Sequence, residues 1–125
     1  MKTFLVLLLL ACAGCATVHR ATDYHGVAIE NGESPIETVE IENTAWLLLK
    51  FIPLGSGDPS HPNESGCQLF QNSVGLQNNL DMLEAEMKRV KASRAINLVS
   101  RKTDETIFVI LLTRHAYHTS AVLLR

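Results

Sequence analysis

The sequence predicts an α+β fold, a small two-layer sandwich in which one main helix covers a mostly antiparallel sheet. Two observations support this prediction. Apolar residues at helical spacing form one stripe within residues 76–92, and three apolar segments of strand character follow with short connections. A helix followed by an antiparallel meander is typical of an α+β domain, because the apolar face of the sheet must be buried against a second layer.

The first predicted strand lies between residues 35 and 52. Polar residues at 38, 40 and 42 alternate with Val39 and Ile41, which is the period of a strand with one wet face. After residue 44 the pattern becomes an unbroken apolar run over 45–49, resumed at 51–52. This favours a strand buried on both faces or a β-rich crossing under a helix.

Residues 53–66 predict a flexible, solvated loop. The segment holds three prolines and three glycines in fourteen residues, so it suits neither a helix nor a central strand. It is also longer than most connections in small domains.

The predicted helix covers residues 76–92. Its apolar residues recur at steps of four, three, four and three, and acidic residues precede basic ones along it, as the helix dipole prefers. The stripe consists of Leu76, Leu80, Leu83, Met87 and Val90.

Three strands are predicted after the helix, at 95–101, 106–112 and 117–124. The connections at 102–105 and 113–116 have the length that hairpins use. The middle strand is apolar on both faces and is expected at the centre of the sheet.

The N-terminal fourteen residues predict an export signal rather than part of the fold. Lys2 precedes an apolar run over 4–11, which is too short to span a bilayer as a helix, since spanning needs about 20 residues. One positive charge, a short apolar run and small residues before a cut site are typical of a secretory signal peptide.

Ala13-Gly14-Cys15 resembles the lipobox of bacterial lipoproteins, in which a peptidase cuts before the cysteine and the sulfur carries a diacylglycerol. The resemblance covers about the first sixteen residues and implies that 1–14 are removed and that Cys15 is lipidated. The sequence departs from the family at Cys12, which stands where leucine is usual. Cleavage before Cys12 is the alternative. It restores a leucine three residues before the cysteine, but it places the bulky Leu10 where a small or β-branched residue is usual.

The resemblance also implies a location and a domain division. Two or three acyl chains hold a protein on a membrane stably, and Ala16 after the lipidated residue implies outer-membrane sorting, with the domain facing the periplasm, if the source is a proteobacterium. Residues 15–34 are mixed and polar and predict a lipidated tether with a short strand at 27–30. One α+β domain over 35–125 follows.

The choice between the two cysteines decides the state of Cys67. If Cys15 carries the lipid, Cys67 is the one thiol left in the mature chain. If Cys12 carries it, Cys15 can bridge to Cys67 instead.

Charge is unevenly distributed along the chain. Residues 16–87 hold two basic and eleven acidic side chains, whereas 88–125 hold eight basic and two acidic ones. A basic segment of this kind can contact an anionic lipid or glycan. The alternative is that the two halves face each other in the fold or are simply solvated. The candidate contacts are Lys88, Arg89, Lys91, Arg94, Arg101 and Lys102.

The residues that catalysis or metal binding would need form no recognisable set. His115 and His118 are three apart in a predicted strand, so they should point to opposite faces, and a zinc site is not expected. Glu37, Glu40 and Glu42 could supply a carboxylate pair for glycoside hydrolysis, but they suit the wet edge of a strand better.

The sequence therefore predicts a membrane-anchored, non-catalytic envelope lipoprotein that contacts or holds another envelope component. We expect no cofactor, no metal and no nucleic-acid partner. The alternative is an accessory or sensor module that binds anionic lipid or glycan through 88–102. A small cell-wall hydrolase is favoured least, because no catalytic set is visible.

Overall fold

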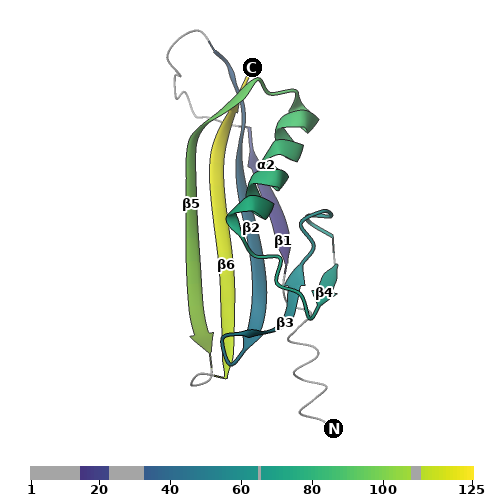
Figure 1. Cartoon of the computed structure of the whole chain (residues 1–125). Coiled ribbons are helices and arrows are strands. Elements are labelled where there is room, and N and C mark those ends of the chain that lie inside the picture. Colours follow the sequence, from purple (N-terminus) through teal and green to yellow (C-terminus); the bar gives the residue numbers. More distant parts are fainter. Residues whose placement is uncertain (1–14, 23–32, 65, 108–110) are drawn as a thin grey trace.

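The structure, a computed structural model, describes residues 15–22, 33–64, 66–107 and 111–125. In this part of the chain a six-stranded sheet carries one helix, α2, on one of its faces (Figure 1). The predicted α+β fold is confirmed. The elements are β1 (Ala16–Ala21), β2 (Pro35–Leu48), β3 (Ile52–Gly57), β4 (Cys67–Leu69), α2 (Leu76–Val90), β5 (Arg94–Ile107) and β6 (Leu112–Leu124).

The sheet is organised around β2, and all its pairs are antiparallel. One edge of β2 pairs with β6, and β5 lies outside β6. The other edge is shared end to end: β1 pairs with residues 38–43 of β2, and β3 pairs with 45–48. β4 lies outside β3.

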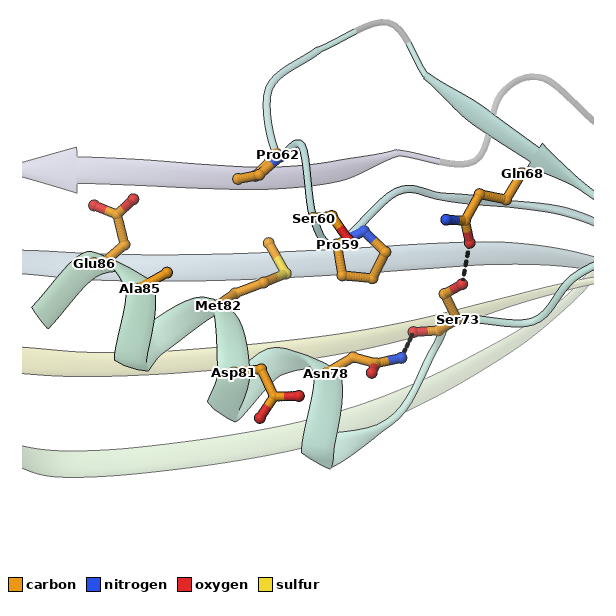
Figure 2. A pocket seen from close by; sticks show the side chains of 10 residues that line it. All are labelled: Pro59, Ser60, Pro62, Gln68, Ser73, Asn78, Asp81, Met82, Ala85 and Glu86. Atoms are coloured by element: carbon orange, nitrogen blue, oxygen red, sulfur yellow. Dashed lines mark hydrogen bonds between the residues drawn. The ribbon is translucent and has the colours of Figure 1, made fainter. Parts of the chain in front are cut away.

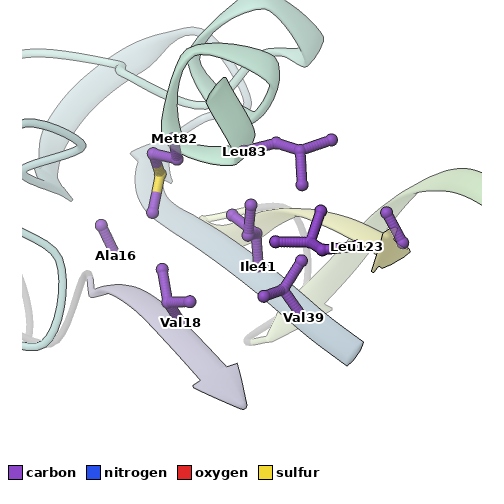
Figure 3. Close-up of a cluster of buried hydrophobic side chains, with 8 residues drawn as sticks. Ala16, Val18, Val39, Ile41, Met82, Leu83 and Leu123 are labelled. Carbon is purple, nitrogen blue, oxygen red and sulfur yellow. The ribbon is translucent and has the colours of Figure 1, made fainter. Parts of the chain in front are cut away.

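One face of the sheet packs against α2 and holds the main core. Val39 and Ile41 of β2 are fully buried there against Met82 and Leu83 of the helix (Figure 3). Because strand side chains alternate, residues 38, 40, 42 and 44 of β2 belong to the opposite face. We call this opposite face, on which no described helix lies, the helix-free face.

The predicted helix forms over residues 76–90, but its buried side is turned relative to the predicted stripe. Leu83 is buried as expected, and Met87 and Val90 pack against the core, whereas Leu76 is 42% exposed. The side chains that face the sheet most closely include two polar ones, Asn79 and Glu86.

Asn79 explains this rotation. Its side chain is fully buried, and its amide donates to the carbonyl oxygen of Tyr117 at 3.0 Å and to the Thr119 hydroxyl at 3.1 Å. The amide thus fixes the helix to β6 through hydrogen bonds that apolar spacing cannot reveal.

The predicted C-terminal meander of three strands is wrong. The structure has two long strands, β5 and β6. The predicted turns at 102–105 and 113–116 lie inside them, and residues 103–105 pair with 114–116. Neither tetrapeptide contains glycine or proline, so nothing in them forces a reversal. β5 ends at Ile107 and β6 begins at Leu112, and both positions fall within the segment predicted as the central strand.

The predicted loop at 53–66 is wrong over its first five residues, which belong to β3. Pro53 is tolerated because it pairs with Leu47 at a register shift in β2, and prolines in sheets are found at such irregularities. The following turn region is tied to β1: the Asn63 side chain accepts from the Val18 N–H at 2.9 Å and donates to the Val18 carbonyl at 3.2 Å.

The predicted tether over 15–34 is wrong for 16–21, which form β1. Ala16 and Val18 alternate with Thr17 and His19, and the two apolar side chains belong to the core. The domain therefore begins at the residue after Cys15. The predicted strand at 27–30 and the predicted signal peptide at 1–14 lie outside the described residues.

We expect Asn79→Ala to lower the free energy of unfolding by about 1–3 kcal/mol, because it leaves buried partners unsatisfied. Chemical denaturation of the purified protein measures this. Gln77→Ala, an exposed position on the same helix, is the control, and its effect should stay within about 0.5 kcal/mol. Equal effects of the two substitutions would contradict the role assigned to Asn79.

Candidate functional site

Cys15 lies at the junction where β1 and β3 meet on the edge of β2. Its N–H donates to the Thr44 hydroxyl at 2.8 Å, and its carbonyl accepts from the Thr44 N–H at 2.9 Å. These two bonds continue the β1–β2 register by one residue and hold Cys15 against the sheet. An acylated Cys15 nitrogen would keep one hydrogen and could make the same bond.

The Cys15 sulfur lies beside the helix-free face. Thr44 belongs to that face, and its hydroxyl lies 3.6 Å from the Cys15 Sγ. Cys15 as a residue is exposed. A thioether sulfur remains a weak hydrogen-bond acceptor, so lipidation is compatible with this contact.

Gly57 lets the chain approach this junction closely. A Cβ on Gly57 would lie 2.1 Å from the Ala16 nitrogen and 2.8 Å from the Cys15 Cα, so no other residue fits without moving the start of β1. Gly57 also pairs with Cys67 of β4. Both described cysteines thus flank one glycine, although the structure has no disulfide between them.

A polar hollow of about 410 Å³ opens on the other face, between α2 and the segment 59–73 (Figure 2). Asn78, Asp81, Met82, Ala85 and Glu86 of the helix form one wall. The opposite wall contains Pro59, Ser60, Pro62, Gln68 and Ser73, and a hydrogen bond of 2.5 Å joins the last two. Apolar and polar side chains share this lining, and it brings together no nucleophile with an adjacent base.

An ion-pair network closes one side of this hollow. Arg20 of β1 donates to both carboxylate oxygens of Glu86, at 2.9 and 2.7 Å, and Arg89 donates to Glu86 at 2.8 Å and also to Glu37 of β2. The Arg20 hydrogen bonds, with those of Arg89, hold the pKa of Glu86 below its ordinary value. The network ties three elements together. Its contacts between elements give no sequence signal, because Arg20 and Glu37 are far from the helix in the chain.

The six basic residues proposed for an anionic partner do not form one patch. Arg94 and Arg101 lie in the same strand but about 23 Å apart along it. Neither Lys91 nor Arg101 pairs with a described carboxylate. The other four do: Lys88 with Glu84, Arg89 with Glu86 and Glu37, Arg94 with Glu33, and Lys102 with Asp104.

Several side chains of the acidic and basic parts of the chain face each other in the fold, as one alternative expected. Ion pairs join Glu33 with Arg94, Glu37 with Arg89, and Glu42 with Arg114. Contacts between the two parts of the chain therefore neutralise some of the uneven charge along the sequence.

The remaining candidates for chemistry are separated. His115 pairs in register with Ala45 and His118 with Glu42, so the two histidines point to opposite faces, as predicted. His115 Nδ1 lies 2.9 Å from Asp104 across the β5–β6 pair, a contact that the sequence did not predict. Glu40 is exposed on the helix-free face, whereas Glu37 lies on the helix side against Arg89.

Comparisons with protein-family models, with curated proteins and with solved structures give no match for this chain. In the described ranges no helix is long and apolar enough to cross a bilayer. Nor do three or more His, Cys, Asp or Glu side chains of those ranges come together as a metal site.

We expect Glu86→Gln to lower the free energy of unfolding at pH 7 by about 1–3 kcal/mol, because it weakens charged hydrogen bonds to two arginines. The loss is limited to this range because water can reach the arginine side chains and hydrate them in the variant. The lowered pKa of Glu86 means that its contribution is present above the unfolded-state pKa, near 4.3. It is lost as the pH falls through the folded-state value. The gap between wild type and variant should therefore narrow on acidification.

Denaturation curves at pH 7 and at pH 3 measure this gap. Glu84→Gln is the matched control, because its pair with Lys88 on the same helix is exposed and should contribute less than about 1 kcal/mol. A gap for Glu86→Gln that is independent of pH would contradict the assignment.

Proposed function

We propose that this protein is a lipid-anchored, non-catalytic lipoprotein of the bacterial envelope that rests on the membrane by its helix-free face and contacts another envelope component with the opposite side. The position of the Cys15 sulfur carries this proposal. The resemblance of residues 13–15 to a lipobox makes this sulfur the point of lipid attachment, and the sulfur lies beside the helix-free face.

The short distance between the proposed anchor and the domain supports this orientation. The first strand begins at Ala16, directly after Cys15, and Ala16 is buried in the core. No tether separates the lipid from the sheet, so acyl chains on the sulfur bring the helix-free face toward the bilayer.

Exposed apolar side chains on the same face support this orientation. Ile52 pairs with Leu48, Leu69 pairs with Gly55, and Val99 pairs with Ser120, and the registers put all three on the helix-free face. Their exposed fractions are 40%, 42% and 61%. Side chains of this kind gain free energy when a bilayer covers them.

The other side of the molecule is the one available to a partner. The polar hollow and the exposed surface of α2 lie there, away from the proposed membrane contact. The hollow offers a partner several polar groups. These are the neutral side chains of Asn78, Gln68 and Ser60 and the carboxylate of Asp81. Binding of an anionic lipid or glycan through 88–102 is supported less well, because most of those cations already have carboxylate partners.

We expect radioactive fatty acid to label the wild-type protein in cells and not Cys15→Ser, because serine removes the sulfur that would carry the diacylglycerol. Cys67→Ser is the control and should be labelled normally. Label that persists in Cys15→Ser and vanishes in Cys12→Ser would move the anchor to Cys12. Label unaffected by either change would overturn the lipoprotein proposal.

We expect a photoactivatable lipid in reconstituted vesicles to crosslink to the helix-free face. Mass spectrometry should find lipid on Leu69 and Ile52 and little on Leu76. Leu69 and Leu76 are both 42% exposed and are the same residue type, so they differ only in the face they occupy. Equal labelling of the two leucines would contradict the orientation.

A further inference from the structure

The outer edge of β5 has no strand partner among the described residues. β5 ends the strand order, pairs with β6 alone, and lies on the side of the sheet opposite to β4 (Figure 1). Its register with β6 is uninterrupted from Val99 to Ile107, after a shift between Ile96 and Val99. An open edge of this length offers a row of unpaired backbone groups to another strand.

The charge sequence along this regular segment is self-complementary. Residues 101–105 are Arg-Lys-Thr-Asp-Glu. When two copies run antiparallel with Thr103 opposite Thr103, Arg101 faces Glu105 and Lys102 faces Asp104, and symmetry makes each pair twice. Charged edges usually discourage pairing, but this order of signs favours pairing with itself.

The faces of the two sheets also agree in this alignment. Arg101 and Glu105 both belong to the helix-free face, whereas Lys102 and Asp104 both belong to the helix side. The same alignment sets Val99, which is 61% exposed, opposite Ile107. Charged and apolar partners thus meet on matching faces.

Neighbouring alignments that keep the faces matched are disfavoured. Sliding one strand along the other by two residues in one direction sets Lys102 opposite Lys102. Sliding it by two residues in the other direction sets Asp104 opposite Asp104. Like charges directly opposite each other destabilise a strand pair. The charges therefore select one register.

We propose that two copies of this chain pair edge to edge through β5, antiparallel and with Thr103 on the two-fold axis, to form one continuous sheet with both α2 helices on the same side. An isologous contact of this kind closes and does not propagate. The proposal does not depend on lipidation.

Charge exchange tests the pairing in the detergent-solubilised full-length protein. Light scattering during size-exclusion chromatography should show a dimer whose dissociation constant rises at least about tenfold in Arg101→Glu, because this change sets a second carboxylate opposite Glu105. The double variant Arg101→Glu/Glu105→Arg restores opposite charges and should return to within about threefold of wild type, since the same pairs form with the signs exchanged. Circular dichroism checks that each variant is folded.

A cysteine on the proposed axis tests the register. Strand partners lie about 4.5–5.5 Å apart at Cα, which a disulfide can span, so Thr103→Cys should give a reducible covalent dimer with a mild oxidant. Thr106→Cys is the control, because its two copies would lie about 20 Å apart in this register while the native cysteines stay the same. A monomer at every concentration, a dimer insensitive to Arg101→Glu, or equal crosslinking of both cysteine variants would overturn the proposal.

Discussion

The three long strands, β2, β5 and β6, are much longer than the helix that lies on their sheet, and this difference in length governs the rest of the structure. The 15 residues of α2 extend over about 22 Å, whereas the 14 residues of β2 extend over about 46 Å. The helix therefore covers one end of its face, and the segment before it covers the other end, where Asn43 donates to the Ser73 carbonyl at 2.6 Å. The polar hollow lies where these two covers meet.

The same long strand explains the junction at Cys15. β2 is long enough for two short strands, β1 and β3, to pair with one edge in succession, and both approach it at Thr44. Two chains can reach the same place only where one of them has no side chain, and Gly57 meets this requirement. The close approach holds the candidate lipidation site against the sheet, so this site directly precedes a strand that contributes Ala16 to the core.

Elements that depend on the local spacing of apolar residues could be predicted from the sequence. Features that depend on which strands pair, or on contacts between distant residues, could not. A strand could be placed from the alternation of polar and apolar residues over 38–42. A helix could be placed from the spacing of Leu83, Met87 and Val90. The hairpin at 102–105 was wrong because charged residues in a strand edge resemble a polar turn, and only the partner strand distinguishes them. The buried Asn79 amide and the Arg20–Glu86 pair join residues distant in sequence, so no local pattern could have indicated them.

The proposed anchor and the proposed dimer satisfy one symmetry condition. Two copies on a single membrane must be related by an axis along the membrane normal. An axis through Thr103 perpendicular to the sheet lies along that normal only if a sheet face meets the bilayer, and the Cys15 sulfur lies beside such a face.

The registers also place the two proposed anchors relative to this axis. Thr103 pairs with Ala116, Ala116 pairs with Thr44, and Thr44 holds Cys15, so both proposed anchors lie level with the axis. Seven strand spacings separate them, about 34 Å. Antiparallel pairing through the outer edge of β5 keeps the same sheet face of both copies on one side, so both sulfurs lie beside the same face of the joined sheet. The open edge of β5 and the placement of Cys15 are therefore compatible with one orientation, although they lie in different parts of the chain.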